Sequence, residues 1–165
     1  MPKNSKLLLS SLLLASSTAL VASDAGSDAR FADRLTGDWG GARSRLADKG
    51  LTFFATFAYT PQDDIAIIPL QSTLGAHYKG LLPGRPDDRT VAFVTYGKFS
   101  DEFFTEQVGL GGSPVDYEMV FEVGHRVQLT KYAYVQPDIQ FIKRPGGTGN
   151  IDDAVVLGVQ FGASF

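Results

Sequence analysis

The fold is decided by residues 116–165, DYEMVFEVGHRVQLTKYAYVQPDIQFIKRPGGTGNIDDAVVLGVQFGASF, because three consecutive segments of this stretch repeat with period two. From Tyr117 to Leu129 every second residue belongs to an apolar and aromatic face, whereas the residues between them supply charges and amides. The alternation recurs over residues 133–141 and, after a Pro-Gly-Gly loop, over residues 155–165. Successive side chains of a β-strand point to opposite faces, so the pattern predicts strands with one apolar and one polar face.

The length of these strands favours a membrane protein. A transmembrane β-strand needs about 9–11 residues to cross the hydrocarbon, with apolar side chains toward lipid and polar ones toward a lumen. The segments are roughly that long, and aromatic residues mark their ends at Tyr117, Tyr132, Phe141 and Phe165. We therefore expect an all-β fold, an antiparallel transmembrane β-barrel. A soluble periplasmic β-protein, with its apolar faces packed together, would alternate in the same way and is the alternative.

Composition limits the functions that are open to this chain. Its 165 residues fit one domain, and 44% hydrophobic residues with 18 glycines favour a closed all-β sheet. The absence of cysteine excludes thiol catalysis, disulfides and thiolate metal sites. The formal net charge of -3 provides no basic footprint, so we expect no nucleic-acid partner.

The N-terminal segment has the features of a secretory signal peptide. Lys3 and Lys6 precede an apolar run from Leu7 to Val21, and small residues follow. This run is too short for a spanning helix of about 20 residues, so we predict a signal peptide at residues 1–22, with a short membrane anchor as the alternative. Because no later segment has the pattern of a transmembrane helix, a membrane location would depend on strands.

The mature chain is expected to begin with a turn and a short helix at residues 23–50. Asp38 is placed to cap this helix, and Gly50 to end it in the left-handed conformation. Residues 51–165 then supply about six outer-membrane strands, an even number that a bacterial barrel requires. With Phe165 at the periplasmic end, residues 100–115 and 144–152 form long outer loops and 130–131 an inner turn. The strands are predicted at 51–59, 72–80, 90–99, 116–129, 132–143 and 153–165.

Four segments carry a resemblance to a known family. They are LTGDWGGARSRLADKG at 35–50, YKGLLPGR at 78–85, QPDIQFIKRPGGTG at 136–149 and DDAVVLGVQFGASF at 152–165. Together they resemble the carbohydrate-selective porins (OprB type) of Gram-negative outer membranes. The resemblance implies passive, carbohydrate-selective transport across the outer membrane, with sugars, outer-membrane lipid and the barrel-assembly machinery as partners. Phe165 looks like the terminal aromatic residue by which outer-membrane barrels are recognised for assembly.

The chain departs from that family in its length. Family members are roughly two to three times longer, with a barrel of about 16–18 strands around an aqueous channel. Here the N-terminal signature and one strand pass directly to the C-terminal strands, so we interpret the chain as a truncated or internally deleted porin. Alternatively, several copies pool their strands as a homo-oligomer, or a reduced sheet persists as a small structural outer-membrane protein. Open sheet edges in lipid cost several kcal/mol per unsatisfied backbone group, so a stable membrane form must close, oligomerise or be plugged.

The same alternation selects the side chains that would face a lumen. Mixed charges, amides and an aromatic ring suit neutral sugars, because polar groups bind hydroxyls and rings cover C–H faces. The alternative is that they are ordinary lumen residues that solvate the wall. The predicted set is Glu118, Glu122, Arg126 and Gln128 on one strand, and Tyr134, Gln136, Asp138 and Gln140 on the next.

Carboxylates on these strands do not make the chain an enzyme. Glu118 and Glu122 are separated by about 13–14 Å of extended strand, beyond the roughly 5–9.5 Å used in glycoside hydrolysis. Glu122 and Asp138 could approach across the hairpin, but an ion network with Arg126 explains them as well. We therefore expect no catalytic residue, no metal and no cofactor. The second class of function is a periplasmic sugar-binding β-protein without channel activity.

Overall fold

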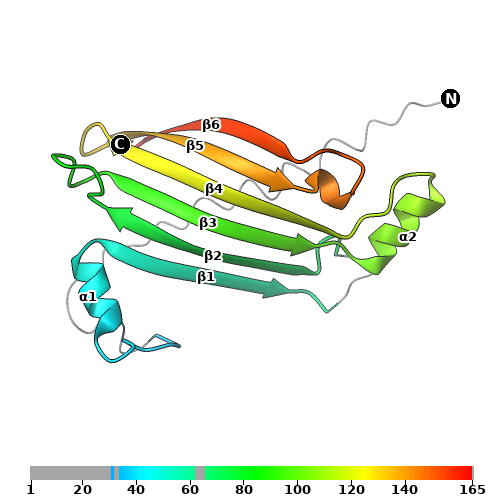
Figure 1. Cartoon of the computed structure of the whole chain (residues 1–165), viewed down its shortest axis with the longest axis horizontal. Coiled ribbons are helices and arrows are strands. Elements are labelled where there is room, and N and C mark those ends of the chain that lie inside the picture. Colours follow the sequence, from blue (N-terminus) through cyan, green and yellow to red (C-terminus); the bar gives the residue numbers. More distant parts are fainter. Residues whose placement is uncertain (1–30, 32–33, 62–65, 165) are drawn as a thin grey trace.

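The computed structural model describes residue 31, residues 34–61 and residues 66–164. These residues form one antiparallel sheet in the order β1-β2-β3-β4-β5-β6, with a helix at each end of the strands (Figure 1). The predicted signal peptide at residues 1–22 and the predicted assembly signal Phe165 lie outside the described residues. The strands are β1 (Leu51–Tyr59), β2 (Leu70–Lys79), β3 (Arg89–Lys98), β4 (Tyr117–Gln128), β5 (Ala133–Lys143) and β6 (Ala154–Ala163).

The strand prediction is confirmed. β1 has the predicted bounds, and the other strands begin and end within two residues of the predicted positions. Each strand pairs with its neighbour in the sequence, as hairpin connections require. Period-two patterning fixes which residues share a face, and short connections leave little freedom in which strand lies beside which.

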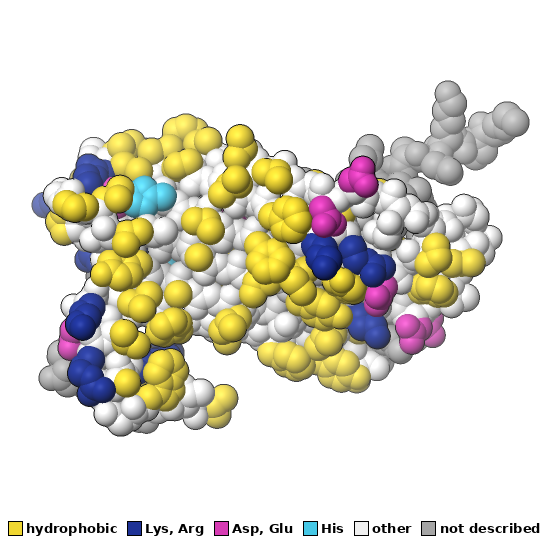
Figure 2. Space-filling model, in the orientation of Figure 1, with side chains coloured by type: hydrophobic (Ala, Val, Ile, Leu, Met, Phe, Trp, Pro, Cys, Tyr) yellow, Lys and Arg dark blue, Asp and Glu magenta, His cyan; other side chains and the backbone are white. Residues whose placement is uncertain are grey.

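The sheet has two chemically different faces, which the strand register defines. Side chains at odd positions of β1, β4, β5 and β6, and at even positions of β2 and β3, form what we call the apolar face. The remaining strand residues form the polar face. Large side chains are exposed on the apolar face, Phe57 by 72%, Leu157 by 78% and Phe161 by 76%. Figure 2 shows hydrophobic side chains spread over the strands on this face.

Aromatic rings lie at both ends of the apolar face, and a lysine lies at one of them. At the end near the second helix, Tyr96 stacks on Tyr117 with ring centroids 5.5 Å apart, and Lys98 is exposed. At the opposite end Trp39 lies 6.0 Å from Phe53, centroid to centroid. Amphipathic rings and long basic side chains are favoured where a membrane meets water. The arrangement therefore suits a sheet whose two ends reach the two membrane interfaces.

The first helix, α1 (Ala42–Asp48), confirms the predicted short helix and its capping by Asp38. The N-cap position itself is Gly41, in the left-handed conformation, which makes no side-chain cap. Asp38 lies three residues before it, across a glycine-rich turn, and accepts hydrogen bonds from the backbone N–H and hydroxyl of Ser44 in the first turn of the helix, at 2.7 and 2.8 Å. Gly50 has the predicted left-handed backbone, with φ 90°, and a Cβ there would overlap the backbone of β2.

The second helix, α2 (Asp101–Gly109), corrects the prediction that residues 100–115 form a loop. The hydroxyl of Ser100 accepts a hydrogen bond from the N–H of Phe103 at 3.1 Å, and acidic residues occupy the first turn, where they complement the helix dipole. Phe103 also stacks on Phe99, with centroids 5.6 Å apart. No residue of α2 is buried, so the helix leaves no apolar periodicity in the sequence.

The sheet is open, with β1 and β6 at its edges. Within the described part of the chain no ladder joins these two strands. The sheet is thus a segment of wall rather than a closed cylinder, as the predicted partial barrel implies. Among the described residues, no helix is long and apolar enough to cross a membrane.

Candidate functional site

The polar face carries all eight side chains that the sequence predicts to line a lumen. The register places Glu122 opposite Gln140 and Gln128 opposite Tyr134, so the eight side chains form two adjacent rows, one on β4 and one on β5. We call these two rows the polar ladder. Gly124 lies opposite Asp138 in the same ladder. The set is Glu118, Glu122, Arg126 and Gln128 on β4, and Tyr134, Gln136, Asp138 and Gln140 on β5.

One amide links the two carboxylates near the middle of the ladder. Gln140 Nε2 donates to Glu122 at 2.9 Å and approaches Asp138 Oδ1 at 3.5 Å. Gly158 of β6 lies against Asp138, since a Cβ at this glycine would come within 2.6 Å of the carboxylate oxygens. Among the described residues Arg126 forms no ion pair with either carboxylate. The alternative of an ion network between Arg126 and these carboxylates is therefore wrong, and Gln140 contacts them instead. The amide of Gln140 separates the like charges, and the cluster offers both acceptors and donors to a hydroxyl.

Arg126 of β4 and Tyr134 of β5 form a stack on the polar face. The guanidinium carbon of Arg126 lies 3.5 Å from the centroid of the Tyr134 ring, which is a close cation–π contact. On the other side the ring occupies the space into which a Cβ of Gly162 would project. The Tyr134 ring is therefore packed between Arg126 of β4 and Gly162 of β6.

Two of the eight side chains bind the turns at the two ends of β4. Glu118 is 2% exposed and accepts a hydrogen bond at 2.6 Å from the N–H of Gly146, within the 3₁₀ turn η1 (Pro145–Gly147). Gln128 donates through Nε2 to the carbonyl of Thr130 at 2.7 Å in the β4–β5 turn. Both side chains are therefore hydrogen-bonded to backbone groups. The residues available to contact a solute are those that lie between Glu118 and Gln128 along the strands.

The sequence reasoning missed two basic residues of the polar face. Lys79 of β2 lies opposite Arg89 of β3, and Arg89 lies opposite Arg126. The alternation within β2 and β3 could have found them, if the strand pairing across the 80–88 turn had shown that the odd-numbered residues of both strands lie on the polar face. That pairing depends on the register of two hairpins, which the pattern of a single strand does not give.

A buried carboxylate fastens the turn between β2 and β3 to the end of β4. Asp88 accepts two hydrogen bonds from Arg85, at 2.8 and 2.9 Å, and one from the backbone N–H of Gln128 at 2.9 Å. Nε2 of His125 lies 3.5 Å from the same carboxylate. The hydrogen bond from Arg85 is the main cause that lowers the pKa of Asp88, and it raises the pKa of Arg85. The cluster therefore stabilises the α1 end of the sheet.

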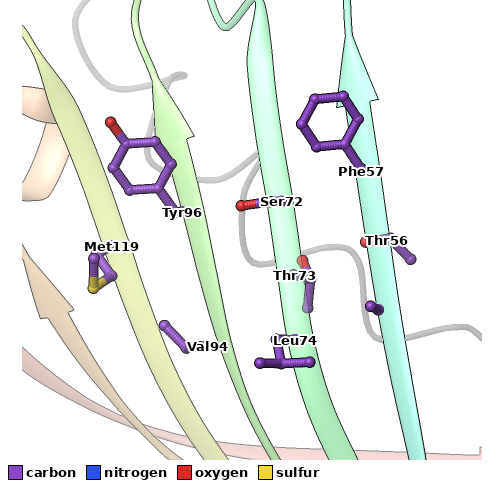
Figure 3. Close-up of a pocket in the computed structure, with 9 residues that line it drawn as sticks. Thr56, Phe57, Ser72, Thr73, Leu74, Val94, Tyr96 and Met119 are labelled. Atoms are coloured by element: carbon purple, nitrogen blue, oxygen red, sulfur yellow. The ribbon is translucent and has the colours of Figure 1, made fainter.

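An open hollow lies on the apolar face, away from the polar ladder. Figure 3 shows it between Phe57 of β1, Leu74 of β2 and Tyr96 of β3, with Met119 of β4 at its edge. The small side chain of Ser72 leaves the space between the larger ones. Its walls are mainly hydrocarbon and aromatic, so this hollow suits an acyl chain better than a sugar.

Comparisons with known proteins agree with this geometry. A family model described as carbohydrate-selective porin, OprB family, matches residues 10–165. Porin B of Pseudomonas aeruginosa is 27% identical over 133 residues, which cover 72% of this chain and 29% of that protein. The high pH structure of Pseudomonas putida OprB shares the fold, with a TM-score of 0.65 and 24% identity over 74% of this chain and 32% of that one. The chain thus spans about a third of the length of these relatives (29% and 32%).

Proposed function

The chain belongs to the carbohydrate-selective porin family of the OprB type, and from that premise we propose that it forms part of the wall of an outer-membrane pore for passive carbohydrate transport in a Gram-negative bacterium. The observation that carries the proposal is the division of the sheet into two faces. One face exposes phenylalanine, leucine and valine side chains along the length of the strands, and the other carries the polar ladder. Lipid covers the first face, and water and sugar meet the second.

The alternative of a periplasmic β-protein requires something to cover the apolar face. In the described residues the two helices lie at the ends of the strands and leave that face open (Figures 1 and 2). An exposed apolar surface that extends over a whole sheet marks a membrane or protein contact rather than a free soluble surface. We assign no catalytic role to the chain, because the carboxylates of the polar face hydrogen-bond to amide and backbone groups.

Six strands alone cannot enclose a passage for sugar. Strands about 4.8 Å apart and tilted by about 40° would close into a cylinder of roughly 38 Å circumference, with a backbone radius of about 6 Å. Inward side chains such as Arg126 and Gln140 would fill that radius. The radius grows with strand number, so a conducting form needs further copies of this chain or further strands from elsewhere. We propose a homo-oligomer in outer-membrane lipid, inserted by the barrel-assembly machinery.

Sugar transport measured separately for the monomer and the oligomer tests this proposal directly. Monomeric and oligomeric fractions, separated in detergent, are reconstituted into liposomes, and the rate of swelling in glucose is compared with that of protein-free liposomes. We expect no swelling with the monomer and sugar-dependent swelling with the oligomer. Steady flux from a verified monomer would contradict the closure argument. Absence of flux from every inserted species would overturn the transport function.

A further inference from the structure

Three cations lie in one row across three neighbouring strands of the polar face. Lys79 is opposite Arg89, and Arg89 is opposite Arg126, so each pair of Cα atoms is separated by only about 4.5–5.5 Å. Side chains directly opposite one another in an antiparallel ladder are neighbours in space. We call Lys79, Arg89 and Arg126 the basic row.

The charges of the basic row are poorly compensated by the protein. Like charges directly opposite one another destabilise a sheet. Lys79 has one distant ion pair, 3.9 Å from the exposed Asp87. In the described part of the chain neither Arg89 nor Arg126 has an ion-pair partner, and Arg126 contacts the ring of Tyr134 instead. Two arginines therefore lie directly opposite each other on one face, and neither forms an ion pair with a carboxylate of the described residues.

Two glutamines extend the line of the basic row across the next two strands, β5 and β6. The pairs Gly124 with Asp138 and Val127 with Val135 set the register that places Gln136 opposite Arg126. Gln136 in turn lies opposite Gln160 of β6. One line across five strands thus presents an ammonium, two guanidinium groups and two amides. The buried carboxylates Glu118 and Glu122 lie farther toward the α2 end, and Asp138 lies in the adjacent row, where the amide of Gln140 approaches it, so the line itself contains cations and amides but no carboxylate.

We propose that the basic row binds the anionic group of a small acidic sugar, a carboxylate or phosphate, while Gln136 and Gln160 bind its hydroxyls. Guanidinium groups pair with carboxylate and phosphate in a bidentate geometry, and an anion between Arg89 and Arg126 removes their mutual repulsion. Amides donate to and accept from hydroxyl groups, which a bare anion does not need. The inference rests on the proposed function, in which the polar face meets water and solute, and it replaces the neutral sugar with an acidic one.

Binding in detergent solution tests the basic row without requiring a closed pore. The full chain is titrated calorimetrically with D-glucuronate, D-glucose and inorganic phosphate at neutral pH. We expect glucuronate to bind at least ten times more tightly than either glucose or phosphate. Arg89→Gln should weaken glucuronate binding by at least about tenfold, since it removes the charged hydrogen bonds from the guanidinium to the carboxylate. Arg45→Gln, the same change on α1, should leave the affinity unaltered.

The outcomes separate this inference from the function on which it rests. Equal affinities for glucuronate and glucose, or an unchanged affinity in Arg89→Gln, would overturn the acidic-sugar site. Phosphate binding as tight as glucuronate binding would also overturn it, because the amides would then contribute nothing. The urea midpoint of ligand-free Arg89→Gln should match or exceed that of the wild type, which excludes misfolding as the cause. Transport in the swelling assay is scored independently, so a failed pore with intact glucuronate binding would contradict only the proposed function.

Discussion

Substitution of a single valine by arginine on either face of β6 distinguishes a lipid-facing surface from an aqueous one. Val159 lies near the middle of β6 on the apolar face and is 61% exposed. Val156, three residues earlier, lies on the polar face opposite Gln140 and is 41% exposed. Val159→Arg and Val156→Arg therefore introduce the same side chain in the same strand, on opposite faces.

The expected cost follows from the environment of each site. An arginine on the lipid face of a transmembrane barrel at the bilayer midplane costs about 2–4 kcal/mol, which is roughly a 30- to 700-fold loss in the folding equilibrium. An arginine on a water-exposed surface changes stability by only about 0.5 kcal/mol in either direction. Val159→Arg should show the larger cost and Val156→Arg the smaller one.

Reversible unfolding by urea in phospholipid vesicles measures both costs. The chain has a single tryptophan, Trp39, which lies beside Phe53 at one end of the sheet and reports folding by its fluorescence. Equal costs for the two variants, or a cost below about 0.5 kcal/mol for Val159→Arg, would refute the assignment of the apolar face to lipid. A large cost for Val156→Arg alone would invert the two faces.

Three further outcomes follow from individual contacts. Gly162→Ala should destabilise by about 1–3 kcal/mol, because its Cβ would enter the Tyr134 ring. Gly149→Ala, whose Cβ would meet only the flexible Arg144 side chain at 4.0 Å, should be nearly neutral in urea unfolding. Wild-type stability contributed by Asp88 should be present above the unfolded pKa near 3.8 and lost as pH falls through the lower folded pKa, and Asp88→Asn should abolish this acid dependence in pH-resolved unfolding. Ser100→Ala should cost about 0.5–2 kcal/mol, through loss of the α2 cap, and hydrogen exchange should show faster opening at Phe103.

The strands could be predicted because their pattern is local. In β4 the alternation from Tyr117 to Gln128 identifies a strand and its two faces without knowledge of any partner. The helix α2 could not be found in that way, since its residues bury no stripe against the sheet. Its stability comes from the cap at Ser100 and from the contact of Phe103 with Phe99, and neither contact produces a period in the sequence.

The candidate site could be predicted only as far as one strand allows. The alternation placed Arg126 and Tyr134 on the polar face, but it could not show that the Tyr134 ring packs closely against Gly162 of β6. It also could not show that Arg89 lies opposite Arg126, because that fact depends on the register between two strands. The chemistry of this face therefore emerges from the pairing of strands, and the number of strands in the complete wall is a property of the assembly.

A site-directed accessibility scan of β6 tests the two-faced wall most directly. The chain contains no cysteine, so single cysteines at positions 156–161 can each carry a nitroxide after reconstitution into vesicles. Collision rates are then measured with oxygen, which concentrates in lipid, and with a water-soluble nickel chelate. We predict a period of two, with oxygen favoured at Leu157, Val159 and Phe161 and the nickel chelate favoured at Val156 and Gln160. Equal accessibility to both reagents at adjacent positions, or exclusion of oxygen from the apolar face, would contradict the assignment of this sheet to a pore wall.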